Sequence, residues 1–345
     1  MLYFSISIEK KSSYSIYSVL VVLGKIVYGL CDLKHDIDIT PNSVECPVVG
    51  CTNKVDRQRH SFRREERFLC PEHKIYISPS TFDYDQETDN LLWNSEEDLV
   101  LLETIKKVKR ECRISRDNSE DAVTWNVFRY LKNTNQLDNL LTWIAQSDQH
   151  NTDLIYWSYS QEAQGAWSEL NKARKEFGEN LQRSSEPDLI ALTDKGLFFI
   201  EAKLTATNNT TPSNRNIRNN YLTGGNEWIK QVFTSKYETI AIDSKLFELF
   251  RFWLLGTWLA SQMAKDFYLI NIVLTEREKD IEQRLFPHIC QSGIRQFKKI
   301  TWEDICKFIH ENAPENNNKE VILNYFENKT IGYYRSNIQR AFILA

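Results

Sequence analysis

The chain has 345 residues, and its 43 basic and 47 acidic side chains give a formal charge of −4. This length allows two domains with cores of their own and excludes a disulfide-stapled miniprotein. Hydrophobic residues at 41%, with only 11 glycines and 8 prolines, exclude a disordered or collagen-like chain. Because the net charge is slightly negative, any contact with nucleic acid must depend on local basic patches.

The first 30 residues contain two apolar stretches. Apolar and polar residues alternate between Phe4 and Ile8, and an apolar run follows that is cut by Lys25. This pattern predicts a hairpin, with a targeting signal as an open alternative. Seven cysteines, an odd number spread over the chain, do not resemble a secreted disulfide framework. We expect a cytoplasmic protein without membrane contact, and the alternative is a membrane-associated protein anchored by residues 13–30.

Four candidate zinc ligands lie close together in the sequence as two short pairs. Cys46 and Cys51 form the first pair, and Cys70 and His73 form the second. Zinc binds four such ligands in a tetrahedron, and two short turns joined by a loop can supply them without strain. We therefore predict a structural Zn²⁺ site, against the alternative of ordinary buried thiols and a surface histidine. A closed four-ligand site leaves no position for substrate, so the expected role of zinc is in folding.

A basic segment separates the two ligand pairs. It carries six basic and three acidic side chains. A zinc-braced loop of this charge is suited to contact nucleic-acid phosphates, and a solvated charged loop without a partner explains the same composition. Both alternatives stay open. The candidate contact residues are Lys54, Arg57, Arg59, Arg63, Arg64 and Arg67.

Two helices are predicted after this segment. Residues 95–110 begin with a serine cap and acidic residues and end with basic residues, which complements the helix dipole. Residues 119–132 carry an apolar stripe at helical spacing, with Glu120 in the first turn. The apolar run at 154–160 then predicts a strand.

The central region predicts a hairpin of two strands. Residues 187–193 and 197–204 are apolar runs joined by the turn sequence Asp-Lys-Gly. The polar segment 205–220 is expected to be a solvated loop. Beyond it we expect two helices and a strand, at 226–238, 245–267 and 267–275.

The second of these helices is apolar enough to be confused with a membrane span. Glu248 and Arg251 interrupt its first two turns, which favours a buried core helix. The chain from residue 276 onward is expected to be mainly helical.

Charged residues cluster where the two strands of the hairpin meet. On an extended strand Glu201 and Lys203 point to the same face, and the hairpin brings Asp188 next to them. Two carboxylates at the end of an apolar sheet repel each other and lose solvation unless a cation lies between them. Magnesium is the natural cation for such oxygen ligands, and a lysine beside it could stabilise the transition state of phosphodiester hydrolysis.

This pattern, Pro187-Asp188 followed by Glu201-Ala202-Lys203, resembles the PD-(D/E)xK nuclease superfamily. The resemblance implies a restriction-endonuclease-like α/β fold with an αβββαβ core and a mixed central sheet. It implies that Mg²⁺, or Mn²⁺, is held by Asp188, Glu201 and the carbonyl of Ala202, while Lys203 assists the attacking water.

Many members of that superfamily also carry a metal-binding glutamate on the first core helix. Glu120 occupies the corresponding place, and its neighbour Asp121 could take the role instead. The order of predicted elements over roughly residues 115–275 is similar to that of the family core.

We therefore expect a metal-dependent endonuclease that acts on DNA, with RNA open as a substrate. The resemblance implies a role in restriction or anti-phage defence, as a homodimer or with a partner subunit. The alternative is a zinc-containing nucleic-acid-binding protein that keeps the fold but does not cut. The expected parts are a zinc-bearing N-terminal module, a nuclease-like core and a mainly helical C-terminal extension, at 1–93, 94–280 and 281–345.

Overall fold

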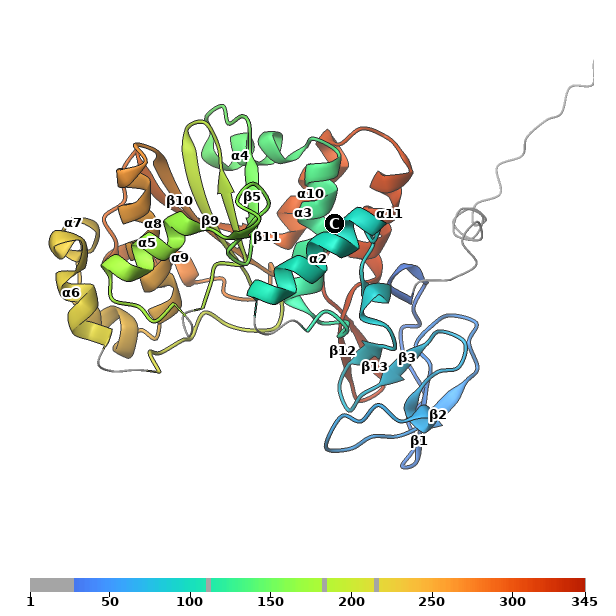
Figure 1. Ribbon diagram of the computed structural model, residues 1–345. Coiled ribbons are helices and arrows are strands. Elements are labelled where there is room, and N and C mark those ends of the chain that lie inside the picture. Colours follow the sequence, from blue (N-terminus) through green and yellow to red (C-terminus); the bar gives the residue numbers. More distant parts are fainter. Residues whose placement is uncertain (1–27, 110–112, 182–184, 214–216, 345) are drawn as a thin grey trace, which may run out of the picture.

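The computed structural model describes residues 28–109, 113–181, 185–213 and 217–344 (Figure 1). The hairpin or targeting segment expected in the first 30 residues therefore lies almost entirely outside the described residues. Within the described part of the chain, no helix combines the length and the apolar character needed to cross a bilayer.

A mixed sheet of seven strands runs through the larger part of the molecule (Figure 1). The strands are β5 (Asp153–Tyr156), β6 (Tyr159–Ser160), β7 (Gly165–Ala166), β8 (Leu189–Leu192), β9 (Gly196–Ala202), β10 (Asp266–Val273) and β11 (Arg295–Thr301). Their order is β11-β10-β9-β8-β5-β6-β7. β9, β10 and β11 are parallel, whereas the other neighbours are antiparallel. This confirms the predicted α/β fold with a mixed central sheet.

Helices cover both faces of this sheet. One core cluster joins one face to α2, α3, α4, α10 and α11, and a second cluster joins the other face to α5, α7 and α8. Successive residues of a strand point to opposite faces, so Leu189 and Ala191 belong to the first cluster and Ile190 to the second. These helices span Glu96–Val108 (α2), Glu120–Asn133 (α3), Leu137–Ala145 (α4), Ser168–Glu176 (α5), Ile229–Val232 (α7), Phe247–Gln262 (α8), Trp302–Asn312 (α10) and Asn317–Asn328 (α11).

Two of the predicted helices lie close to where the sequence placed them, although α8 ends at Gln262 rather than at residue 267, because β10 begins at Asp266. The Ser119 hydroxyl accepts a hydrogen bond from the Ala122 N–H at 3.1 Å and caps α3. α8 is buried along most of its length, as expected of a core helix. The remaining short helices are α6 (Arg218–Glu227), α9 (Ile281–Leu285), a π-helix at Thr239–Asp243 and 3₁₀ turns at Tyr28–Leu30, Glu66–Phe68, Glu87–Asn90 and Phe286–His288.

The polar segment after β9 is not solvated throughout. Asn208 is buried, and its Nδ2 donates to Asn271 Oδ1 at 2.8 Å. The expectation of a solvated loop is wrong at this position, because the Asn208 amide is buried and donates to the side chains of Asn271 and Glu278.

Two small hairpins form the N-terminal module and pack against the C-terminal end of the chain. They are β1 (Ser43–Glu45) with β2 (Lys54–Asp56), and β3 (Ile75–Ile77) with β4 (Phe82–Tyr84). A third hairpin, β12 (Thr330–Tyr334) with β13 (Asn337–Arg340), shares their core cluster through Tyr333 and Ile338. Figure 1 shows β12 and β13 beside β3, so the two ends of the described chain form one body.

The C-terminal part contains helices α9, α10 and α11, as expected, together with three strands that the sequence did not predict. β11 has only Phe297 and Ile300 buried among basic and polar residues. Its residues become a strand because β10 offers an open edge with which they pair in parallel register.

Candidate active site and zinc cluster

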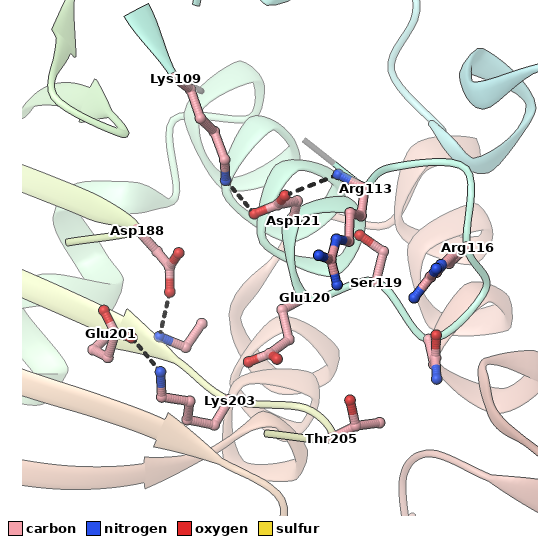
Figure 2. Close-up of a pocket in the computed structure, with 12 residues that line it drawn as sticks. Lys109, Arg113, Arg116, Ser119, Glu120, Asp121, Asp188, Glu201, Lys203 and Thr205 are labelled. Atoms are coloured by element: carbon pink, nitrogen blue, oxygen red, sulfur yellow. Dashed lines mark hydrogen bonds and ion pairs between the residues drawn. The ribbon is translucent and has the colours of Figure 1, made fainter. Parts of the chain in front are cut away.

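A pocket of about 360 Å³ opens where β8 begins and β9 ends (Figure 2). Four carboxylates and four basic side chains are among the residues that line it. The structure thereby brings together all five residues that the nuclease resemblance assigns to the magnesium site. The lining residues are Lys109, Arg113, Arg116, Asn118, Ser119, Glu120, Asp121, Asp188, Glu201, Ala202, Lys203 and Thr205.

Asp188 lies immediately before β8 and is held against the end of β9. Its Oδ2 accepts a hydrogen bond from the Ala202 N–H at 2.8 Å, and its Oδ1 accepts one from Trp157 Nε1 at 3.3 Å. Burial raises the pKa of the Asp188 carboxyl to about 6, because the charged form has lost its water.

Glu201 is the most deeply buried acid of the pocket, with 4% of its surface exposed. Its Oε1 lies 2.5 Å from Lys203 Nζ. Its Oε2 is buried and has no hydrogen-bond partner among the described residues. Burial and the nearby carboxylate of Glu248 raise the pKa of Glu201 well above its usual range. A buried acid with an unsatisfied oxygen is suited to bind a cation.

Lys203 lies between two acids rather than one. Its Nζ donates to Glu201 and, at 2.9 Å, to Oε2 of Glu248 in the first turn of α8. Burial opposes the charged form, but the carboxylates of Glu201 and Glu248 outweigh it and raise the pKa of Lys203 well above its usual range. The lysine therefore enters the site as an ammonium cation.

Glu120 reaches the pocket from the first residue of α3. Its Oε2 accepts a hydrogen bond from the Leu204 N–H at 3.1 Å, and burial raises its pKa to about 7. Its neighbour Asp121 forms an ion pair with Lys109 and accepts a hydrogen bond from the Arg113 N–H at 3.4 Å (Figure 2). Because Asp121 is occupied by other partners, the geometry favours Glu120 as the acid available to the site.

The predicted zinc ligands also come together, in the N-terminal module. His73 Nδ1 lies 3.6 Å from Cys46 Sγ and 3.7 Å from Cys70 Sγ, and Cys51 Sγ lies 3.9 Å from Cys70 Sγ. A zinc tetrahedron with bonds of about 2.3 Å to sulfur and about 2.0 Å to nitrogen has edges of roughly 3.5–3.8 Å. These three spacings are close to the edges of a Cys3His site.

Burial and electrostatics of this cluster suit a structural metal. The three sulfurs are buried, and the four ligand atoms lie within 4.8 Å of one another. A hydrogen bond with Cys70 and burial raise the pKa of the Cys46 thiol, because the proton is held between the two sulfurs and a buried thiolate loses its water. Gly50, with φ +82°, allows the turn that returns the chain to Cys51. The cluster could therefore hold a structural Zn²⁺.

The basic segment between the ligand pairs does not reach the pocket. Arg57 donates to the Thr40 carbonyl at 3.2 Å, and Arg59 donates to the Pro41 carbonyl at 2.6 Å. Arg64 forms an ion pair with Asp83. Lys54, Arg63 and Arg67 form exposed ion pairs with Asp38 or Glu65. Among the described residues, none of the six predicted contact residues lines the pocket.

Several residues that line the pocket or contact its lysine were not found by sequence reasoning. Glu248 is 45 residues beyond Lys203 and was interpreted only as a charge that excludes a membrane helix. Lys109, Arg113 and Arg116 belong to a basic run that was interpreted partly as the end of a helix. The density of basic residues in that run is the one signal that could have identified them.

Comparison of this chain with protein-family models, with curated proteins and with solved structures finds no match. The functional argument therefore depends on the geometry of the site and on the sequence pattern.

Proposed function

We propose that this chain is a divalent-metal-dependent phosphodiesterase that cuts DNA as an endonuclease. The observation that carries the proposal is the buried Oε2 of Glu201, which lacks a partner among the described residues and belongs to the same pocket as Asp188. Two buried acids and a charged lysine at the end of a sheet are the donor set that phosphodiester hydrolysis with Mg²⁺ needs.

The residues that would hold Mg²⁺ are Asp188, Glu201 and the carbonyl of Ala202, with Glu120 as support. A bound dication lowers the pKa of water and withdraws charge from the phosphate. Hydrogen bonds within the chain fix the positions of these carboxylates. The Ala202 N–H and Trp157 Nε1 donate to Asp188, and the Leu204 N–H donates to Glu120. Little reorganisation is then needed when the substrate binds.

Lys203 is the residue placed to stabilise the reaction. Its ammonium group is mostly buried, between Glu201 and Glu248. In such a poorly hydrated position, a cation stabilises the developing negative charge of a pentavalent phosphate more strongly than it would in water. Glu248 orients the lysine and does not touch the substrate.

The order of elements and the acid–lysine pattern also support placing the chain in the PD-(D/E)xK nuclease superfamily. The wider proposals follow from that resemblance: DNA rather than RNA as substrate, and a role in restriction or defence against foreign DNA. The Cys3His cluster supports a structural zinc role, and the exposed arginines of the module leave a contribution to DNA binding open.

Cleavage of plasmid and linear DNA by the purified protein with Mg²⁺ tests the proposal. Asp188→Asn and Lys203→Ala should each lower the cleavage rate by about 10²–10⁴-fold, because each removes one group of the reaction centre. Asp194→Asn and Lys195→Ala are the matched controls, since they change exposed residues in the turn at the other end of the same hairpin.

The controls should cut at the wild-type rate. Equal cutting by the wild type, Asp188→Asn and Lys203→Ala would contradict the proposal. Tight DNA binding without cleavage, unaffected by Mg²⁺, would favour the alternative of a nucleic-acid-binding protein that has the fold without the activity.

A further inference from the structure

The pocket has a basic wall that the proposed magnesium chemistry does not use. Arg113 and Arg116 line this wall and are exposed, in the described residues 113–118 that precede α3 (Figure 2). Lys109 adds a third charge, but it is largely buried, paired with Asp121 and placed 4.0 Å above the ring of Trp157. The two arginines are therefore the cations of this wall that a large ligand can approach from solvent.

The backbone that carries the arginines is fixed by the N-terminal module. The Asp117 N–H donates to the carbonyl of Phe82 in β4 at 2.9 Å. Asn90 Nδ2 donates to the carbonyl of Ile114 at 2.6 Å and to that of Arg116 at 2.8 Å. The segment thus extends the edge of the β3–β4 hairpin, although its sequence gives it no strand character of its own.

The C-terminal hairpin fixes the same segment from a second side. Asp117 is 1% exposed, and its carboxylate pairs with Lys329 Nζ at 3.1 Å and accepts a hydrogen bond from the Thr330 hydroxyl. A buried ion pair of this kind orders the backbone around it. Residues 114–117, beside and including the second arginine, are therefore held by hydrogen bonds from both sides, which lowers the entropic cost of binding a ligand there.

The charge of the pocket also suits an anion once a metal is bound. Its four carboxylates and four basic side chains nearly cancel, so a dication leaves a net positive charge. Figure 2 shows the acids Asp188 and Glu201 on one side of the pocket, the arginines on the other and Glu120 between them. An extended anion that enters the metal site would therefore pass along the arginines.

We propose that Arg113 and Arg116 bind backbone phosphates of the nucleic acid next to the phosphodiester that is cut. This inference rests on the proposed function, and it identifies the surface along which the substrate enters. Guanidinium groups bind phosphate oxygens through paired hydrogen bonds, and such contacts position the strand without reading its sequence. The N-terminal module then serves the site by holding this segment in place.

Equilibrium binding of a fluorescein-labelled duplex, measured by fluorescence anisotropy over a range of NaCl concentrations, tests the inference. The variants are Arg113→Gln, Arg116→Gln and the double variant. Lys307→Gln is the control, because it removes one charge from a lysine whose side chain is 73% exposed on α10. The zinc content and melting temperature of each variant show that the fold is kept.

Each arginine variant should weaken binding by about tenfold at low salt, and the double variant by about a hundredfold. The slope of log Kd against log salt should fall by about 0.9 for each arginine removed. Each contact between an arginine and a phosphate releases one condensed counterion from the DNA, and the variant lacks that contact. In cleavage assays the loss should appear mainly as a higher KM and only in smaller part as a lower kcat, since the arginines hold phosphates beside the reacting one.

The inference is overturned if the double variant matches Lys307→Gln in affinity and salt slope. Binding is measured separately from cleavage, so the two proposals can fail separately. A wild type that binds DNA through these arginines but never cuts it contradicts the endonuclease activity alone. A wild type that cuts, with the double variant binding normally, contradicts the arginine contact alone.

Discussion

At the scale of single residues, two carboxyl groups of the pocket bind their protons more tightly than they do in the unfolded chain. Burial raises the pKa of Glu120 to about 7 and that of Asp188 to about 6. Without metal, the protonated forms stabilise the fold below about pH 4, and this contribution is lost as the pH rises through 6 to 7. A bound dication replaces the protons, so proton binding and metal binding compete at this site.

The Mg²⁺-induced rise in melting temperature should therefore grow between pH 5 and pH 8. Glu120→Gln removes the group with the higher of these two pKa values and should move the midpoint of this increase to lower pH. Differential scanning fluorimetry with and without Mg²⁺ across this pH range measures the rise in melting temperature. The exposed-turn variant Asp194→Asn is the control. A metal effect that does not depend on pH in the wild type would contradict the assignment of these carboxyls.

Glu248 is the residue whose role only the three-dimensional structure reveals. Glu248→Gln should lower kcat by about tenfold, because Lys203 loses one of the two carboxylate charges that orient it. The acid limb of the pH–rate profile should move to lower pH, since Glu248 is a cause of the raised pKa of Glu201.

Glu320→Gln is the matched control for this prediction. Glu320 lies in the first turn of α11 as Glu248 lies in the first turn of α8, so both substitutions remove a favourable charge from a helix N-terminus. A purely structural role of Glu248 would lower the melting temperature of Glu248→Gln and leave the pH profile unchanged.

At the scale of elements, the sequence predicted best where a local pattern and the packing agree. The apolar runs of β8 and β9 and the cap of α3 placed Asp188, Glu201, Lys203 and Glu120 close to their observed positions. β11 escaped prediction, because its strand character comes from the open edge of β10. The basic wall was not predicted, because its residues are held by contacts with β4 and β12, which lie far away in the sequence.

The two ligand turns of the N-terminal module should fold around one zinc ion. Cys46→Ser should lower the zinc content from about one to near zero per chain and make the module sensitive to protease, because metal binding contributes much of the folding energy of such small units. Cys290→Ser is the control, since Cys290 lies outside the cluster. Elemental analysis measures the zinc, and an unchanged zinc content in Cys46→Ser would contradict the Cys3His site.

At the scale of the whole molecule, the two ends of the described chain depend on each other. Gly332 in β12 has φ +127°, and a Cβ atom there would lie 2.0 Å from the carbonyl oxygen of Ser80. The Tyr333 N–H donates to the same oxygen at 2.9 Å. Only glycine allows the two backbones to come this close.

Gly332→Ala should therefore destabilise the protein by roughly 1–3 kcal/mol, because the hairpin must move away from the N-terminal module. Gly293→Ala is the control, since no atom lies within 4 Å of its added Cβ. Chemical denaturation measures the free energy of unfolding, and chelator-induced zinc release should be faster in Gly332→Ala. Equal stability of the two variants would contradict the dependence of the module on the C-terminal hairpin.

The proposed activity requires that Asp188 and Glu201 share a divalent cation. Anomalous diffraction from crystals soaked in Mn²⁺ tests it most directly, because the ion is located without reference to activity. We expect one Mn²⁺ within about 2.2 Å of an oxygen of each carboxylate, and its loss in Asp188→Asn. Well-ordered carboxylates with no Mn²⁺ between them, in crystals of a protein that cuts DNA with Mn²⁺, would contradict it.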